Sequence, residues 1–485
     1  MHLQRVQVPD FRVLKDVDIT FEKDFSPRVF PLGSQNGGGK STLLQLIFVL
    51  LHCSTNPSRH FAIKNLLNGF TLRKGEDKRV LAIVDIWNGE KTIQLEFFVC
   101  GDTYIQKKYN AAINESEKTD LFLLSFYLFA RVENLQQKIN GFEKENSYLK
   151  DIIEEFGYRN SDNTSFSFMN SRESLKKRLS NLGFKFDSLE VDFSDPDSLN
   201  KTLKEIKVHL SNRHEKLKDE QLKISKLVYK LIESLKSDNI KYITYYAQKD
   251  IFNEIEIEAL LCNIPDEDHD FLECLSNKVF LSAPSTQVFL FLNRNSRKSL
   301  FTSKSTYLSD LISANSDLSG LFTYDFLATD ILIQAFKNAR DTDFKEALKT
   351  GEYGNNYKKL LQDLDFLLNN KQVNLMDDFS GLTFKLDRFK DSIELYPEDL
   401  SHGELKRLSV YVWLKYKNIE DSIVLMDEVD LALHPDWQYQ IVSDLIDWSA
   451  SNQYVLATHS YELCNALTPS HVKILEPKLT ERRSD

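Results

Sequence analysis

The first part of the chain alternates apolar and polar residues in short runs that are typical of half-buried strands. Four stretches have this pattern, at residues 3–8, 17–21, 79–87 and 92–99. The last two flank Asn88-Gly89, a dipeptide that favours a tight hairpin turn. A short apolar run at residues 28–32 leads into a second apolar run at residues 43–48. We therefore expect strands around one apolar helix in this part of the chain.

After residue 120, apolar residues recur at spacings of three, four and seven, which is the spacing of helices. In the second helical stretch a strict seven-residue repeat is formed by Leu203, Leu210, Leu217, Ile224 and Leu231. The pattern predicts two helices that fold back antiparallel as a coiled coil, with a polar tip at residues 159–195. The companion heptad positions are only partly apolar, so an ordinary helical subdomain packed on the core is the alternative.

Strands are expected again from about residue 240. The candidates are at residues 242–246, 278–282, 287–292, 422–426 and 453–457, with a largely helical stretch at 310–369. Short apolar strands separated by helices favour a parallel sheet whose strand ends carry the chemistry. The predicted organisation is an N-terminal lobe at residues 1–120, an arm at 121–240 and a C-terminal lobe at 241–485.

The composition is that of an ordinary soluble globular protein, with 485 residues, 42% hydrophobic and 27% charged. The net charge of −11 argues against bulk affinity for nucleic acid. A local DNA contact is left open by one basic cluster, for which a solvated loop is the alternative: Arg294, Arg297, Lys298 and Lys304. The five cysteines lack metal-ligand spacing, and no signal-peptide pattern or membrane-length apolar run is found, so a cytoplasmic protein without membrane contact is expected.

Residues 33–42, GSQNGGGKST, are close to the P-loop pattern G-x-x-x-x-G-K-[ST], with Ser34 at the position of the first glycine. Glycines let backbone N–H groups fold around phosphate oxygens. Lys40 is expected to reach the β and γ phosphates, and Ser41 to ligate Mg²⁺. The alternative is a glycine-rich turn without a ligand. The predicted nucleotide-binding residues of this loop are Asn36, Gly37, Gly38, Gly39, Lys40, Ser41 and Thr42.

Three further motifs lie near the end of the chain. Asp427 and Glu428 end an apolar strand, where one carboxylate can hold Mg²⁺ and the next can accept a proton from the attacking water. His459 follows another apolar strand. Ser401 is expected to cap a helix, with Glu404 three residues later completing a capping box.

The order of the motifs along the chain resembles that of ABC-type ATPases. The P-loop is followed by L-S-H-G-E at 400–404, D-E at 427–428 and T-H-S at 458–460. The closest likeness is to the SMC-like branch, in which a coiled coil interrupts the head. The resemblance covers residues 1–120 and 240–485. It implies an α/β fold, namely an ATPase head with a mixed sheet and a P-loop, interrupted by an antiparallel helical coiled-coil arm.

The resemblance also implies ATP and Mg²⁺ as ligands, held in a sandwich between two heads. The residues implied for catalysis are Glu428, His459 and Lys40, and those implied for the metal are Ser41 and Asp427. A second head would supply Ser401 and Gly403. The family's Q-loop glutamine is left open between Gln248 and Gln287.

Residues 431–438, LALHPDWQ, resemble the ATPases of bacterial anti-phage systems, and the longer blocks around them most resemble Septu-type ATPases, which also occur in retron defence cassettes. This implies an oligomer of at least two heads that pairs on ATP and regulates a separate nuclease, an HNH endonuclease in Septu systems. Nucleic acid would be contacted through the complex. The alternative is an SMC-like DNA-repair or chromosome-organising ATPase that binds DNA directly; a transporter ATPase is a weak third, because it would lack a heptad arm.

Overall fold

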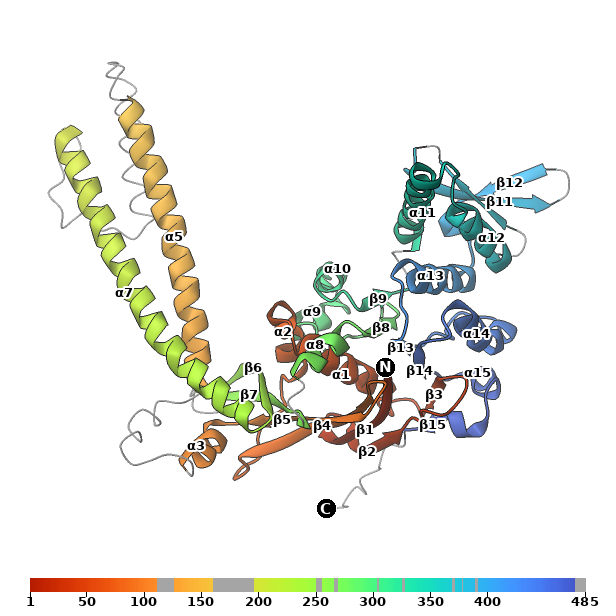
Figure 1. The fold of residues 1–485 in the computed structure, drawn as a ribbon, viewed down its shortest axis with the longest axis horizontal. Coiled ribbons are helices and arrows are strands. Elements are labelled where there is room, and N and C mark those ends of the chain that lie inside the picture. The colour runs from red at the N-terminus through yellow and green to blue at the C-terminus, as the bar shows by residue number, and fades with distance from the viewer. Residues whose placement is uncertain are drawn as a thin grey trace. The chain divides into compact units, whose positions relative to one another are not determined.

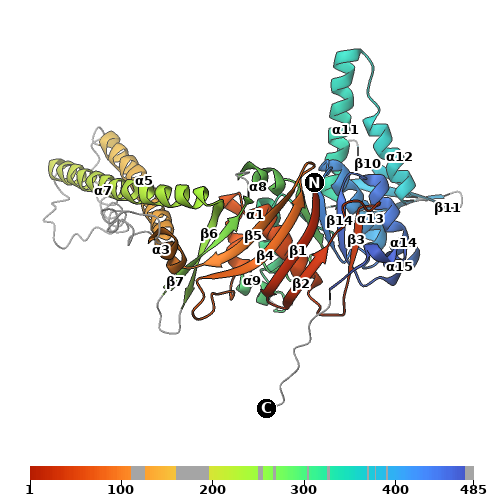
Figure 2. The same cartoon turned by 60° about the horizontal axis from the view of Figure 1, so that its bottom comes forward.

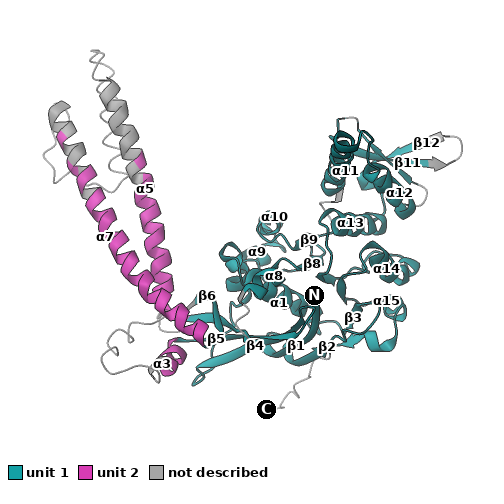
Figure 3. Ribbon diagram, viewed as in Figure 1, with its two compact units in different colours: residues 1–101, 238–248, 258–485 teal, residues 102–237, 249–257 magenta. Residues whose placement is uncertain are grey.

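The structure is a computed structural model and describes residues 1–110, 126–159, 196–249, 255–265, 269–302, 305–324, 328–368, 371–376, 378–388 and 391–475. The chain forms two compact units (Figure 3). Unit 1 comprises Met1–Gly101, Asp238–Gln248 and Glu258–Asp485, and unit 2 comprises Asp102–Ser237 and Lys249–Ile257. Most of the predicted tip of the arm lies outside the described residues.

One sheet of unit 1 has six strands in the order β2-β1-β4-β5-β7-β6. Their bounds are Leu14–Thr20, His2–Phe11, Lys78–Trp87, Thr92–Cys100, Ile255–Asn263 and Ile240–Lys249. The pairs from β2 to β7 are antiparallel, and the first four strands lie side by side in Figure 2. The predicted hairpin of β4 and β5 is confirmed, and Gly89 in its turn has a φ of 113°, which favours glycine.

A second sheet is parallel throughout and has the order β15-β3-β14-β13-β8-β9. Its strands are Lys473–Ile474, Val29–Gly33, Gln453–Ala457, Ile423–Asp427, Val279–Ala283 and Leu321–Thr323. Along β13, Ile423 and Leu425 lie in one hydrophobic core, and Val424 and Met426 lie in another. Both faces of the strand are therefore buried, which explains its continuous apolar run and confirms the predicted parallel sheet.

Helix α1 (Lys40–Cys53) packs on β8, β13 and β14 and is buried along nearly all of its length. Its core also contains residues of the antiparallel sheet, such as Leu3 and Val84. Helices α13 (His402–Tyr416), α14 (Pro435–Trp448) and α15 (Tyr461–Asn465) contribute to the core on the other face of the parallel sheet (Figure 1). The shorter helices α2, α8, α9 and α10 span His60–Leu66, His269–Ser276, Arg294–Ser299 and Tyr307–Asp317.

The strand predicted at residues 287–292 is wrong. Phe289 and Phe291 are fully buried, as the alternating pattern required, but the segment forms turns. Its backbone is held by side chains instead of a neighbouring strand: the N–H of Leu290 donates to Gln45 Oε1 at 2.6 Å, and the N–H of Phe289 donates to the Tyr307 hydroxyl at 3.4 Å. Gln45 interrupts the apolar helix α1 to make this contact.

An insertion between β9 and α13 was predicted only as a helical stretch. It contains α11 (Ala328–Thr350) and α12 (Asn356–Leu368), followed by a three-stranded antiparallel sheet of β10 (Lys371–Leu375), β11 (Leu382–Arg388) and β12 (Asp391–Leu395). Apolar residues of this insertion share a core with one face of α13. The insertion is therefore anchored on the helix that begins at the L-S-H-G-E motif.

Unit 2 contains α3 (Asp102–Asn110) and two long helices, α5 (Tyr127–Arg159) and α7 (Pro196–Ser237). Arg131 pairs with Glu220, and further along α5 the ring of Phe142 lies 4.8 Å from the Arg213 guanidinium, earlier on α7, so the two helices run antiparallel as predicted. Their description as a coiled coil stays a prediction. No helix in the described part of the chain combines the length and the apolar character needed to cross a membrane.

The packing of α13 on α14 gives a stability prediction. Arg407 Nη2 lies 2.7 Å from Asp444 Oδ2, and the two side chains are only 6% and 8% exposed. The Asp444→Ala variant leaves a buried guanidinium without its partner, so the free energy of unfolding should fall by about 3–5 kcal/mol in urea denaturation followed by tryptophan fluorescence. The exposed neighbour Asp447 is the control, and Asp447→Ala should change stability by less than about 0.5 kcal/mol. Equal effects of the two variants would contradict this account.

Candidate nucleotide site

The glycine-rich loop lies between β3 and α1, as the sequence predicts. Gly37 and Gly39 have φ values of 80° and 92°, in the left-handed region that favours glycine. A Cβ on Gly39 would lie 2.7 Å from Leu14 Cδ2, so a side chain there would also collide with the β1–β2 turn. The loop is therefore shaped by backbone conformations and close contacts that require glycine.

A cavity of about 410 Å³ opens over this loop. Its lining brings together residues from four separate parts of the sequence: Val13, Asn36, Gly37, Gly38, Gly39, Lys40, Ser41, Thr42, Asp427, Glu428 and His459. All of the predicted P-loop residues, both acids of the D-E motif and the histidine thus face one space. Its size lies within the range of small-molecule sites.

Lys40 is the cation of this cavity. Its side chain is nearly buried, and desolvation lowers the pKa of Lys40, while the charges of Asp427, Asp430 and Glu428 act in the opposite direction. Lys40 Nζ lies 3.0 Å from His459 Nε2 and 3.1 Å from Ser34 Oγ. Since an ammonium group only donates hydrogen bonds, Nε2 of His459 accepts this one.

Ser34, which replaces the first glycine of the P-loop pattern, therefore contacts the P-loop lysine directly. Its hydroxyl donates to the carbonyl of Gln35 at 2.9 Å and accepts from Lys40. A Cβ on Gly38 would lie 2.4 Å from Ser34 Oγ. Ser34 thus fills the space beside Gly38 and supplies an acceptor for Lys40 in place of a phosphate oxygen.

Asp427 is 2% exposed, and its Oδ2 atom has no hydrogen-bond partner among the described residues. Burial raises the pKa of Asp427 to about 6, although a hydrogen bond from Ser41 lowers it; the neighbouring Glu428 raises it further. A buried carboxylate with one oxygen that has no described partner, beside a hydroxyl, fits Mg²⁺. Proteins usually hold this ion with one or two oxygen ligands while phosphates and water complete its shell. Ser41 and Asp427 are thus the residues that would hold the metal.

Glu428 follows directly and has a φ of 51°, an unusual conformation for a residue with a side chain. Its N–H donates to the carbonyl of Ala457 at 2.9 Å, and its own carbonyl accepts from Lys406 Nζ at 2.8 Å. Lys406 belongs to α13 and is almost buried. Sequence analysis missed Lys406, whose role depends on a partner 22 residues away.

A second missed residue connects the loops that carry Glu428 and His459. Gln438 on α14 accepts a hydrogen bond from Ser460 Oγ at 2.7 Å. Its amide nitrogen donates to the carbonyl of Leu433 at 3.0 Å. Gln438 therefore joins the segment after β13 to the segment after β14. Gln438 lies in the block at residues 431–438 that resembles anti-phage ATPases, but spacing alone does not reveal which residues it contacts.

Ser401 and Gly403 lie at the start of α13 and do not line the cavity. Ser401 Oγ accepts from the N–H of Glu404, and Glu404 Oε2 accepts from the N–H of Ser401 at 2.9 Å, so the predicted capping box is confirmed. A Cβ on Gly403 would lie 2.9 Å from the carbonyl oxygen of Ala432 and 3.2 Å from a ring carbon of Trp437. Gly403 therefore allows close packing of α13, while Ser401 is exposed.

The two glutamines left open for the Q-loop lie in different parts of the fold. Gln248 is on β6 in the antiparallel sheet. Gln287 follows β8, the neighbour of β13 in the parallel sheet, at the same edge as Asp427. Its place after β8 favours Gln287, although it does not line the cavity; the side chain of Gln248 lies outside what the structure describes.

The loop, its helix and the acidic strand end define a P-loop nucleotide-binding protein. A family model described as AAA ATPase domain matches residues 1–464. The chain therefore belongs to the AAA ATPase domain family.

Three curated proteins are similar to parts of the chain. Retron Vc95 probable ATPase of Vibrio cholerae serotype O1 biovar El Tor is 25% identical over 221 residues, which is 37% of this chain and 42% of that protein. Retron Ec83 probable ATPase of Escherichia coli is 36% identical over 55 residues, which is 11% of this chain and 10% of that protein. The DNA replication and repair protein RecF of Saccharophagus degradans is 32% identical over 100 residues, which is 20% of this chain and 26% of that protein. The chain thus spans less than half the length of each relative.

Solved structures of Smc heads are also similar. One is the Smc head domain with an extended coiled coil bound to the C-terminal domain of ScpA from Pyrococcus furiosus, at 12% identity and a TM-score of 0.32, over 96% of this chain and 91% of that chain. A second, the Smc head domain with a coiled coil and joint from Pyrococcus yayanosii, is 13% identical with a TM-score of 0.32, over 96% and 93%.

The bridge made by Gln438 gives a prediction about catalysis. The Gln438→Leu variant loses the three side-chain hydrogen bonds that join the two loops, to Asp430, Leu433 and Ser460. Glu428 and His459 should then be held less accurately while the P-loop is unchanged. We expect kcat for ATP hydrolysis to fall by about 10- to 100-fold, with little change in the Kd of a fluorescent ATP analogue. Tyr439→Leu, an exposed neighbour on α14, is the control. A Gln438→Leu enzyme with the parental kcat would show that the bridge does not position these loops.

Proposed function

We propose that this chain is the ATP-hydrolysing subunit of an anti-phage defence complex that pairs its heads on ATP and regulates a separate nuclease. The observation that carries the ATPase part is the single cavity shared by Lys40, Asp427, Glu428 and His459. Ser41 and Asp427 would hold Mg²⁺, which would supply positive charge against the charge that develops on the phosphates. We assign phosphate binding and proton transfer to side chains of this protein.

Within one head, each group has a distinct task. Lys40 would give up its contacts with Ser34 and His459 to bind the phosphates. Glu428 would take the proton of the attacking water, because its side chain faces the same cavity and its backbone is held by Ala457 and Lys406. His459 Nε2 lies 3.0 Å from Lys40 Nζ, so it lies next to the group that meets the terminal phosphate.

Pairing of two heads is supported by the place of Ser401. Ser401 caps the exposed start of α13, and its hydroxyl does not line the cavity of its own head. The same hydroxyl can serve as a cap in a single head and as a hydrogen-bond donor to the terminal phosphate held by a second head. A composite site of this kind would make hydrolysis depend on head pairing.

The defence role and the nuclease partner rest on sequence. Two of the similar proteins are named retron ATPases, and the blocks around residues 431–438 resemble Septu-type ATPases. We propose that ATP-dependent pairing holds or licenses a separate nuclease subunit of the HNH type.

The alternative, an ATPase of DNA repair or chromosome organisation that binds DNA directly, is favoured by one observation. Arg297 Nε is buried without a hydrogen-bond partner among the described residues. Desolvation lowers the pKa of Arg12, and the positive charge of Arg297 lowers it further. An unneutralised pair of this kind suits a phosphodiester anion. The similarity to RecF points the same way.

The Glu428→Gln variant tests the ATPase proposal. The amide cannot take a proton, yet it keeps the size of the side chain, so the variant should bind ATP while hydrolysis falls by at least about 100-fold. In size-exclusion chromatography with light scattering, ATP should then convert the variant from single to paired heads. The exposed Glu420 at the opposite end of β13 supplies the control, Glu420→Gln, which should hydrolyse ATP normally.

Parental hydrolysis by Glu428→Gln would remove Glu428 from the mechanism, and an unchanged mass in ATP would contradict pairing. The purified protein can also be used to distinguish the defence role from the DNA-repair alternative. Direct, salt-dependent DNA binding by the chain alone, weakened by Arg297→Glu, would favour the repair alternative over the defence complex.

A further inference from the structure

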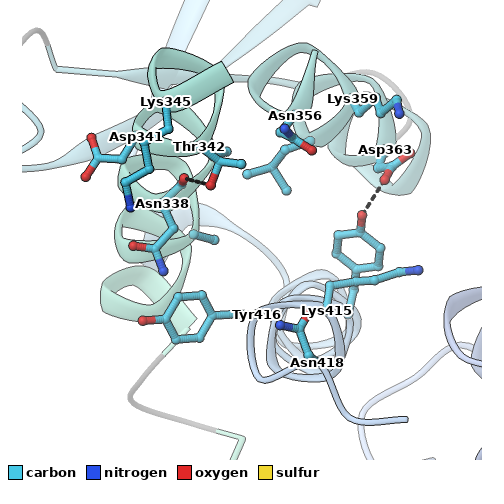
Figure 4. Close-up of a pocket in the computed structure, with 14 residues that line it drawn as sticks. Asn338, Asp341, Thr342, Lys345, Asn356, Lys359, Asp363, Lys415, Tyr416 and Asn418 are labelled. Atoms are coloured by element: carbon cyan, nitrogen blue, oxygen red, sulfur yellow. Dashed lines mark hydrogen bonds between the residues drawn. The ribbon is translucent and has the colours of Figure 1, made fainter. Parts of the chain in front are cut away.

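A second cavity lies in unit 1 between α11, α12 and the last turn of α13 (Figure 4). Its volume of about 770 Å³ is within the range of sites for small organic ligands. None of its lining residues lines the nucleotide cavity. Helix α13 reaches from one functional region to the other, because it begins after Ser401 and ends beside this second cavity at Tyr416.

The walls of the second cavity carry positive charge that is available to a ligand. Each helix contributes one exposed lysine to the lining: Lys345 from α11, Lys359 from α12 and Lys415 from α13. The charge of Lys359 helps to lower the pKa of Asp343, a buried carboxyl on α11 that accepts hydrogen bonds from the N–H groups at the start of α12. No acidic partner is found for Lys345 or Lys415 among the described residues. In a chain with a net charge of −11, three lysines around one space favour an anion, even though Asp343 offsets part of the charge of Lys359.

The two acids of the lining are already engaged. Asp341 forms an ion pair with Arg340 at 2.8 Å. Asp363 Oδ2 accepts a hydrogen bond from the Tyr411 hydroxyl at 2.6 Å, which also joins α12 to α13. Their carboxylates therefore oppose an anion less than free acids would, and the positive charge of the lysines on the three helices is only partly offset, by Asp343 at Lys359.

The rest of the lining suits a flat, polar ring. Tyr416 is half-buried, and Figure 4 shows it on the same side of the opening as Asn338, with Asn418 also from the end of α13. In this view Lys345 and Asn356 lie at the upper edge of the opening, and Tyr416 and Asn418 lie at the lower edge. A tyrosine ring can stack on a nucleobase, and side-chain amides can both donate to and accept from its edge.

We propose that this cavity binds a nucleoside phosphate, with its phosphate near Lys345 and Lys359 and its base against Tyr416. The ligand is either a free mononucleotide or one nucleotide of a single-stranded nucleic acid, since both present the same chemistry. It would contact all three helices and so join α11 and α12 to α13, the helix that begins at Ser401. The site is separate from the ATP cavity and goes beyond the proposed function.

Binding can be measured in the full chain with the first site silenced by Lys40→Ala. The probes are AMP, GMP, CMP and UMP, a 5′-phosphorylated pentathymidylate, and inorganic phosphate, each titrated at low salt by calorimetry. On this background Lys359→Glu reverses a charge in the cavity. Lys358→Glu makes the same change one residue earlier on α12, outside the lining, and is the matched control. Tyr416→Ala removes the ring, and Tyr416→Phe keeps it.

We expect saturable binding of a mononucleotide or of the oligonucleotide, weakened at least about tenfold by Lys359→Glu and by Tyr416→Ala. Lys358→Glu and Tyr416→Phe should change the affinity less than about threefold. Preference for mononucleotides or for the oligonucleotide identifies the source of the nucleoside phosphate. Binding of inorganic phosphate alone, equal effects of Lys358→Glu and Lys359→Glu, or no saturable binding of any nucleotide probe would each overturn the proposal.

Discussion

The register of three parallel strands determines where the groups that face the nucleotide are placed. Asp427 at the end of β13 pairs with Ala457 at the end of β14, and Ala457 pairs with Leu32 of β3. Because strands in parallel register end at one edge, the loops that follow them emerge side by side. The 3.0 Å contact between Lys40 and His459 is a direct result. A slip of one residue in β14 would turn its side chains to the other face and separate these groups.

Helix α13 connects this edge to the rest of unit 1. Lys406 holds the carbonyl of Glu428, and Gly403 lets the helix approach Ala432 closely. The first turn of α13 carries the exposed Ser401, and its other face shares a core with the insertion of α11 and α12. In the proposed pairing, a partner that binds at the start of α13 therefore acts on a helix that already holds the backbone of the proposed general base.

The parts of this arrangement that could be predicted are local in sequence. The P-loop glycines, the capping box of Ser401 and the buried strand before Asp427 each depend on residues within a few positions. The roles of Gln438 and Lys406 depend on partners 22 residues away. Residues 287–292 alternate like a strand, but distant side chains satisfy their backbone. Spacing alone also gave no sign of the short strands β10 to β12, which pair only with each other.

The central claim is that each ATP site is completed by a second head, and a mixing experiment tests it most directly. Lys40→Ala lacks a working P-loop, and Ser401→Arg places a bulky cation where the partner's phosphate would dock, so each variant alone should be inactive. Equal mixing should restore about a quarter of parental ATPase activity, because half of the pairs contain one intact composite site of two. No recovery in the mixture, or full activity of Ser401→Arg alone, would contradict a site shared between heads.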